Sequence, residues 1–312
     1  MVLTQLVVLL IGLGVVSFFS ERAVLCSTQL AKRLKVPPLV IGVILISVGT
    51  DIPEIANSIF SSYANHGDIN VGDTLGSCLT QITLVFGLAV LLGGSAIAHR
   101  KNILILGACA IAAVALAALV VLDGHLTRSD ALLLILSYII LIAVSAKFTI
   151  KEIGYAKEPD LFCPKEEGYL LTTLSLVLSL IFVVVGAVLV IESAIEISTS
   201  LKLPEFFISF FVIGIGTSLP ELSVELAALR QKQYGILLGD LMGSNITDAT
   251  LALGIGPLLF PTIISGEVII PFAFYVVFAT LVTVALFAWR EKMDRHSAIV
   301  LIAVYLSSLM LT

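Results

Sequence analysis

The chain has 312 residues, of which 59% are hydrophobic and only 12% are charged, and its formal net charge is −5. Its mean hydropathy of +1.12 is far above that of soluble domains, in which about 25% of residues are charged. A soluble protein of this size could not hide so much apolar surface from water, so the composition excludes a soluble fold and indicates a lipid-embedded protein.

Apolar stretches long enough to cross a bilayer recur along the whole chain. The first of them lacks a basic leader and a small-residue cleavage site, so we predict a membrane helix and not a removed signal peptide. We predict an all-α membrane protein whose ten spans lie at residues 3–30, 38–64, 71–94, 102–122, 130–149, 169–199, 205–229, 235–260, 267–289 and 297–311.

The longest hydrophilic stretch, residues 150–168, divides the ten predicted spans into two groups of five. The expected organisation is therefore a first repeat at 1–150, a linker at 151–168 and a second repeat at 169–312. Lysine and arginine residues gather in the loops after the odd-numbered spans, with 14 there and only two, Arg128 and Lys202, on the opposite face. The positive-inside rule then predicts a cell-membrane protein with both termini outside and the 150–168 loop in the cytoplasm.

The two halves repeat each other at an offset of 167 residues. Residues 49–54 read Gly-Thr-Asp-Ile-Pro-Glu and residues 216–221 read Gly-Thr-Ser-Leu-Pro-Glu. A Gly-Asp-x-x-Gly-Ser segment at 72–77 matches another at 239–244 in the same register. Each predicted half has five spans, an odd number, so the second copy must enter the membrane from the other side. Inverted repeats of this kind are typical of transporters.

Both Gly-Thr-x-x-Pro-Glu segments are expected to break their helices. Proline has no N–H for the carbonyl four residues earlier, and its ring crowds that turn. Carbonyls freed in hydrocarbon are tolerated only where protein, water or an ion satisfies them. Beside each break the sequence places hydroxyl, amide and carboxylate oxygens, which suit Ca²⁺, Na⁺ or Mg²⁺ rather than soft metals. These side chains are Thr50, Glu54, Ser77 and Gln81 in the first copy and Thr217, Ser218, Glu221, Ser244 and Asp248 in the second.

No lysine or arginine lies within residues 36–99, 203–229 or 233–289. The same stretches contain several acids, and a charged acid at the bilayer centre costs roughly 2.5–3.5 kcal/mol. Bound cations or protons are therefore the expected partners of Asp51, Glu54, Asp73, Glu221, Asp240 and Asp248. Asp73 and Asp240 follow glycines near span starts, so capping or support of the ligands is the alternative for these two. Glu225, whose repeat mate is Ser58, is assigned to an ion path or an interface.

These paired segments resemble the α-repeats of the cation/Ca²⁺ exchanger superfamily, especially its compact prokaryotic Na⁺/Ca²⁺ exchangers. The resemblance covers the chain length, the span count, the outside termini and both repeats. It implies a secondary antiporter, without enzymatic activity or a cofactor, that exchanges Ca²⁺ for Na⁺ by alternating access. It also implies Glu54 and Glu221 as central Ca²⁺ ligands, Gln81 and Asp248 at the other central corners, and, around flanking Na⁺ sites, Thr50, Ser77, Thr217, Ser218, Ser244 and the carbonyls of Ser47 and Gly214.

The chain departs from the family pattern in its acids. Asp51 stands where the family usually has serine, which adds a carboxylate at an expected Na⁺ ligand. Gln81 replaces the more common asparagine or acid, and Asp73 and Asp240 replace the usual asparagines. Acids that repel one another bind protons more readily. An H⁺-coupled exchanger of Ca²⁺ or another divalent cation is therefore the alternative function.

Two other functional classes, a protease and a channel, are alternatives to an exchanger. An intramembrane aspartyl protease would use two membrane acids as an acid–base pair, but neither Gly72-Asp73 nor Gly239-Asp240 has the expected G-x-G-D context. A passive cation channel would be separated from a slow exchanger by single-channel recording. The expected partners are small cations and the lipid bilayer, with no nucleic acid and no obligate protein partner.

Overall fold

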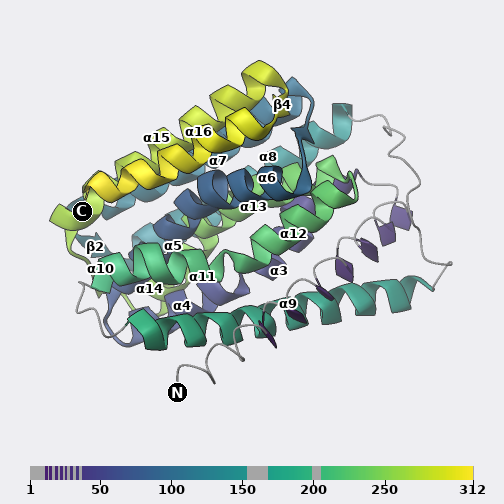
Figure 1. Cartoon of the computed structure of the whole chain (residues 1–312). Coiled ribbons are helices and arrows are strands. Elements are labelled where there is room, and N and C mark those ends of the chain that lie inside the picture. Colours follow the sequence, from purple (N-terminus) through teal and green to yellow (C-terminus); the bar gives the residue numbers. More distant parts are fainter. Residues whose placement is uncertain are drawn as a thin grey trace.

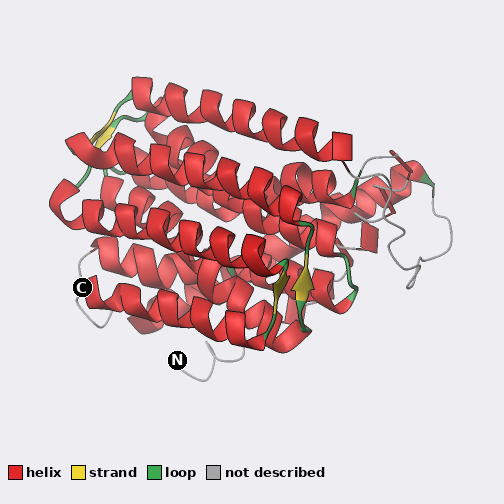
Figure 2. Cartoon of the chain, turned by 90° about the horizontal axis from the view of Figure 1, so that it is seen from above, coloured by secondary structure: helices red, strands yellow, loops and turns green. Residues whose placement is uncertain are grey.

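The computed structural model describes residues 37–152, 168–198 and 205–311, with further helical residues scattered between 11 and 34. The described chain is helical apart from two short strand pairs and the connecting turns (Figures 1 and 2), which confirms the predicted all-α class. Most of the first predicted span, most of the predicted 151–168 linker and Lys202 lie outside the described residues.

The first half contains α2 (Pro38–Ile41), η1 (Gly42–Ile46), α3 (Ser47–Thr50), α4 (Ile52–Tyr63), α5 (Gly67–Leu79), η2 (Thr80–Val85), α6 (Phe86–Gly93), β1 (Ala96–Ile97), α7 (Arg100–Val120), η3 (Val121–Asp123), β2 (His125–Leu126) and α8 (Arg128–Glu152). The second half contains α9 (Tyr169–Ser198), α10 (Glu205–Phe207), η5 (Ile208–Ile213), α11 (Gly214–Thr217), α12 (Leu219–Arg230), α13 (Tyr234–Thr247), η6 (Asp248–Ala252), α14 (Leu253–Leu259), β3 (Thr262–Ile263), α15 (Gly266–Arg290), β4 (Lys292–Met293), α16 (Arg295–Ser307) and η7 (Ser308–Leu311).

The elements of the first half recur in the second at the offset of the sequence repeat. For example, α4 (Ile52–Tyr63) and α12 (Leu219–Arg230) begin and end 167 residues apart. The strand pairs follow the same relation, because β1 pairs with β4 and β2 pairs with β3, so each pair joins the two halves. The sequence duplication is therefore matched by a duplication of secondary structure.

The membrane-spanning character of the fold is carried by long apolar helices. Two bent pairs, α2–α4 and η5–α12, raise the number of candidate spans in the described chain from four to six. The four continuous candidates are Gly67–Gly93, Arg100–Asp123, Arg128–Phe148 and Gly266–Arg290. The full count of ten spans and the opposite insertion of the halves stay predictions. The α8 span is only 17% buried, and its exposed leucine and isoleucine side chains form a surface suited to lipid.

The two halves cross where glycines allow helices to touch. A Cβ on Gly76 would lie 2.2 Å from the carbonyl oxygen of Phe210 on η5, and a Cβ on Gly243 would lie 2.9 Å from the Cα of Val43 on η1. These two contacts are related by the repeat offset. At the centre, repeat mates meet each other: the Cys78 thiol donates to the carbonyl of Asn245 at 3.8 Å. The interior ends of α5 and α13 are thus fixed against the opposite half.

We expect Gly76→Ala to destabilise the protein by about 1–3 kcal/mol, since the added methyl group meets backbone that cannot move aside. Thermal unfolding of the detergent-purified chain measures the effect. Gly168→Ala is the matched control, because a Cβ at Gly168 meets nothing within 4 Å. Equal unfolding temperatures for the two variants would contradict the close crossing.

The long helix α9 runs along one side of the molecule, next to helical residues of the N-terminal region (Figure 1). The rings of Phe19 and Phe182 stack with centroids 4.5 Å apart. Two residues before Phe182 on α9, Leu180 packs so closely on Gly49 that a Cβ on Gly49 would lie 2.7 Å from the Cδ1 atom of Leu180. Leu180 therefore covers the first Gly-Thr-x-x-Pro-Glu segment with an apolar side chain.

Candidate ion-binding site

Both Gly-Thr-x-x-Pro-Glu segments contain a helix break. Helix α3 ends before Asp51 (φ −81°, ψ 6°), and helix α11 ends before Ser218 (φ −80°, ψ 5°). The flanking helices are bent by 43° at each break. Pro53 and Pro220 then lie in the first turn of α4 and α12, where the missing N–H would have no helical partner anyway. The proline that interrupts one helix therefore starts the next.

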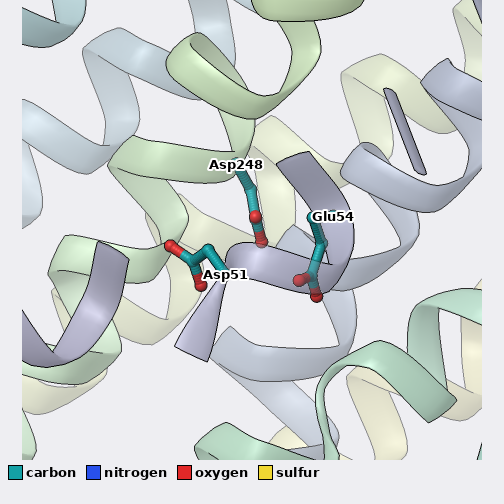
Figure 3. A group of neighbouring side chains, drawn as sticks. All are labelled: Asp51, Glu54 and Asp248. Atoms are coloured by element: carbon teal, nitrogen blue, oxygen red, sulfur yellow. The ribbon is translucent and has the colours of Figure 1, made fainter. Parts of the chain in front are cut away.

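Three carboxylates from the two halves converge at the first break. Asp51, Glu54 and Asp248 each have an oxygen within 4.8 Å of those of the other two, and all three residues are 0% exposed. In Figure 3, Asp51 and Glu54 extend from the first-half chain and Asp248 reaches them from the second half. We call Asp51, Glu54 and Asp248 the central cluster. One cation would fit within its span.

Asp51 stands at the N-cap of α4, where a carboxylate usually accepts from the first N–H groups of the helix. Here its side chain makes no such bond, and both its carboxyl oxygens are buried without a hydrogen-bond donor. The carboxylate is therefore available to a ligand. This is the residue that replaces the serine expected from the family pattern, and the structure brings it into the central cluster.

Glu221 lies beside the central cluster and is not one of its three members. It is 1% exposed, neither of its carboxyl oxygens has a donor, and it lies within charge–charge range of Asp51 and Glu54. The second-half glutamate thus adds a fourth negative charge to the region. Glu221 is thus close to both Glu54 and Asp51, and its pairing with Glu54 as a central ligand stays a prediction.

Ser77 links the two halves through its hydroxyl group. Its Oγ atom lies 3.4 Å from Oε1 of Glu54, 3.4 Å from the carbonyl oxygen of Gly214 and 3.0 Å from the hydroxyl of Thr217. Four residues of the sequence-predicted set, Glu54, Ser77, Gly214 and Thr217, therefore meet in one oxygen-rich position. This position is next to the central cluster and is the best candidate for a flanking monovalent cation.

The carbonyls of Ser47 and Gly214 are not free in this conformation. The Ser47 carbonyl accepts from the N–H of Asp51 and the hydroxyl of Thr50. The Gly214 carbonyl accepts from the N–H of Ser218 at 3.3 Å and from the hydroxyl of Ser218 at 2.7 Å. The hydroxyls of Thr50 and Ser218 thus donate to their own helix, which leaves the lone pairs of their oxygen atoms able to bind a cation.

The last central corner is formed by repeat mates. The Gln81 amide donates to Oδ2 of Asp248 at 3.0 Å, and its own oxygen accepts from Asn245 at 3.3 Å. Asp248 keeps its Oδ1 atom free of any donor. Asn245 is a site residue that sequence reasoning missed, although it directly follows the Gly-Ser pair of the second copy. The amide of Gln81 thus orients Asp248 towards the cluster.

Asp73 and Asp240 occupy equivalent repeat positions but have different surroundings. Asp73 accepts from the amide of Asn57 at 2.6 Å and from the hydroxyl of Thr217 at 3.1 Å. Asp240 is equally buried, yet neither of its oxygens has a donor, and the nearby Ser244 hydroxyl also lacks a partner. Asp73 therefore helps to hold Thr217 in place, and its role as a ligand or as support for the ligands stays a prediction. Asp240 remains open to a ligand.

We expect Asp73→Asn to lower the ion-free stability by about 1–3 kcal/mol, because the single oxygen of the new amide can accept from only one of the two donors, Asn57 and Thr217. Asp240→Asn removes a buried charge that has no donor, so it is expected to leave that stability unchanged or to raise it. Thermal unfolding in buffer free of Ca²⁺ and Na⁺ measures both. Equal losses in the two variants would contradict the difference between the repeat positions.

The electrostatics of the region are uniformly negative. The buried acids are Asp51, Glu54, Asp73, Glu221, Glu225, Asp240 and Asp248. No lysine or arginine occurs in the sequence stretches that carry them. Two like charges roughly 5 Å apart repel by about 3 kcal/mol at an effective dielectric constant of about 20. The geometry therefore requires cations or protons to compensate these charges.

Comparison with known proteins gives consistent matches over the whole chain. The sequence profile of the family described as "Sodium/calcium exchanger protein" matches residues 4–147 and 171–312. The chain is 32% identical over 299 residues to an uncharacterized membrane protein of Methanocaldococcus jannaschii, covering 95% of this chain and 94% of that one. It is 30% identical over 298 residues to the inner membrane protein YrbG of Escherichia coli, covering 91% and 88%. The solved structure of the sodium–calcium exchanger NCX_Mj matches with a TM-score of 0.80 at 30% identity, covering 99% of both chains.

Proposed function

We propose, from the premise that this chain belongs to the sodium/calcium exchanger family, that it exchanges Ca²⁺ for Na⁺ across a membrane by alternating access. The observation that carries the proposal is the central cluster, in which carboxylates of both halves converge in a fully buried position. The match to an exchanger that was soaked with Na⁺ and Sr²⁺ supports it.

The ligand set favours Ca²⁺ as the divalent cargo. Ca²⁺ takes six to eight oxygen ligands in flexible geometry, and the region of Asp51, Glu54, Glu221 and Asp248 offers carboxylate oxygens without donors. Na⁺ also prefers hard oxygen ligands, and the position around Ser77, Thr217 and the Gly214 carbonyl adds neutral ones. The two ions would therefore compete for Glu54, which belongs to both groups.

Competition at a negative site explains why transport would be an exchange. An empty cluster leaves several repelling carboxylates buried together, and closing the protein around it is unfavourable. A bound Ca²⁺ or a set of Na⁺ ions removes that repulsion. The loaded protein therefore changes conformation readily and the empty one does not, so the return step needs the counter-ion.

The burial of the site favours a carrier over a passive channel. Asp51, Glu54 and Asp248 are all 0% exposed, so in this conformation the central cluster has no contact with water on either side of the membrane. Leu180 of α9 covers the first break from the side. A channel needs a continuous path through its site, whereas a carrier passes through a closed state such as this one.

The function is tested by flux measurements in proteoliposomes with the Na⁺ and pH gradients imposed separately. An outward Na⁺ gradient is expected to drive ⁴⁵Ca²⁺ uptake. Uptake driven only by a pH gradient would replace Na⁺ by H⁺ as the coupling ion, an alternative favoured by the additional carboxylate of Asp51. No coupled uptake with either gradient would reject exchange. The predicted orientation, with both termini outside and the 150–168 loop cytoplasmic, is part of this proposal.

A further inference from the structure

The two halves differ sharply on one side of the central cluster. In the first half the hydroxyl of Ser58 accepts from the N–H of Gly256 at 3.1 Å, which ties α4 to α14. In the second half Glu225 occupies the equivalent position at the same offset. A small structural hydroxyl is thus replaced by a carboxyl group that has no corresponding structural bond.

Glu225 and Asp240 are both 0% exposed, and none of their four carboxyl oxygens has a hydrogen-bond donor. They lie on α12 and α13, which pack against each other, and Glu225 is within charge–charge range of both Asp240 and Glu221. Glu225 follows Glu221 by four residues, which is about 6 Å along the helix axis. Asp240 is also within charge–charge range of Asp51, so the pair is next to the central cluster but distinct from it.

A row of polar side chains runs along α13 and includes Asp240 of this pair. Gln233, Asp240, Ser244 and Asp248 are spaced by seven, four and four residues, so they follow one helical face. Each has a buried oxygen without a donor. In the first half, by contrast, Asp73, Ser77 and Gln81 are engaged in hydrogen bonds and His66 is exposed. Each member of the second-half row thus keeps at least one oxygen without a donor, although Asp248 also accepts from Gln81.

We propose that Glu225 and Asp240, together with the hydroxyl of Ser244, form a second binding site for the transported divalent cation, between the central cluster and the turn that joins α12 to α13. The assignment rests on the proposed function, because it takes the same cargo. Two carboxylates offer four hard oxygens and balance a charge of +2, and water can complete the shell of Ca²⁺.

The site would serve as an intermediate binding site on one side of the transport path. An ion bound there is attracted by the same acids as the ion in the central cluster. The two bound ions repel each other. Arrival of an ion at one site therefore promotes departure of the ion from the other site. The predicted orientation puts the α12–α13 turn on the cytoplasmic side. In the first half Ser58 and Asp73 occupy the repeat positions of Glu225 and Asp240, and both are engaged in hydrogen bonds. The intermediate binding site is therefore expected on one face of the membrane only.

Calorimetric titration of the purified full chain in nanodiscs with Ca²⁺ alone tests the site. Glu225→Ser with Asp240→Asn restores the first-copy residue at one position and neutralises the other, and it is expected to bind one Ca²⁺ fewer than the original chain. Glu54→Gln with Asp248→Asn disables the central cluster and is expected to keep one Ca²⁺. Glu267→Gln, which removes an exposed acid, is the matched control.

Unchanged Ca²⁺ stoichiometry and affinity in the Glu225→Ser, Asp240→Asn variant would overturn the second site while leaving the exchanger function intact. Glu225→Gln, an isosteric change, provides a second variant in case the first does not fold, and the same unchanged binding in it would have the same meaning. If the original chain neither binds nor transports Ca²⁺, the proposed function itself fails.

Flux measurements test the one-sided position. In oriented proteoliposomes, the KM for Ca²⁺ on the face of the α12–α13 turn is expected to rise at least roughly tenfold in the double variant, a loss typical even of residues that only support metal ligands. The KM on the opposite face is expected to stay unchanged. An equal rise on both faces would overturn the assignment of the pair to one side of the path.

Discussion

Glutamine in place of Glu54 is expected to abolish Ca²⁺ exchange and to weaken Ca²⁺ binding at least roughly 100-fold, because the charge count of its ligands strongly sets Ca²⁺ affinity. Glu54 is a member of the central cluster and also accepts from Ser77, so its loss affects both the divalent position and the flanking one. Glu221→Gln is expected to abolish exchange too, with a smaller loss of Ca²⁺ affinity, because Glu221 lies beside the cluster. Na⁺-gradient-driven ⁴⁵Ca²⁺ uptake and calorimetric titration measure the two effects.

Glu267→Gln is the matched control for these variants, because it makes the same chemical change at an exposed position in the first turn of α15. It is expected to transport and bind like the original chain. Retained exchange in both Glu54→Gln and Glu221→Gln would refute the candidate site. If Glu221→Gln lost more Ca²⁺ affinity than Glu54→Gln, the cargo ion would lie closer to the second helix break than to the central cluster.

Much of the site could be predicted because its causes are local in sequence. Pro53 and Pro220 break their helices for a reason that any membrane helix shares, the missing N–H and the crowding ring. The duplicated motifs identified Glu54 and Glu221, and the absence of basic residues showed that their charges need another partner. Periodicity and composition were likewise enough for an all-helical membrane fold.

The remaining features depend on contacts between helices, which no local pattern records. Asn57 reaches Asp73 across α4 and α5, and Asn245 reaches Gln81 across the two halves. The sequence places Asp73 and Asp240 in equivalent motifs, so it could not show that only Asp73 receives donors. In the second half, the repeat position of Asn57 is occupied by Val224, whose side chain has no amide to donate to Asp240. Equivalent positions in a duplicated chain thus acquired different roles through their partners.

Asp51 shows the same divergence at the centre of the site. Its repeat mate Ser218 uses its hydroxyl to bond the carbonyl of Gly214, as a serine in a helix commonly does. The carboxylate of Asp51 makes no such bond and joins Glu54 and Asp248 instead. One difference between the copies therefore replaces a hydroxyl that bonds its own helix by a carboxylate that has no donor.

Asp51→Ser, which makes the first copy read like the second, is expected to raise the KM for Ca²⁺ at least roughly tenfold, a loss seen even when only supporting residues of a metal site change. It is also expected to make uptake less sensitive to acid pH, because fewer carboxylates share the position where protons compete with cations. Initial rates of Na⁺-driven ⁴⁵Ca²⁺ uptake, measured over a range of pH and Ca²⁺ concentration, test both effects.

Transferring the carboxylate provides the sharpest control for Asp51. The variant that combines Asp51→Ser with Ser218→Asp keeps the number of acids but moves one to the second break. If charge alone sets Ca²⁺ affinity, this variant recovers the original KM. If position matters, as the 4.8 Å grouping of Asp51 with Glu54 and Asp248 indicates, recovery is incomplete. An unchanged KM in Asp51→Ser alone would mean that the cargo is held without Asp51, and its charge would then be balanced by a proton rather than by Ca²⁺.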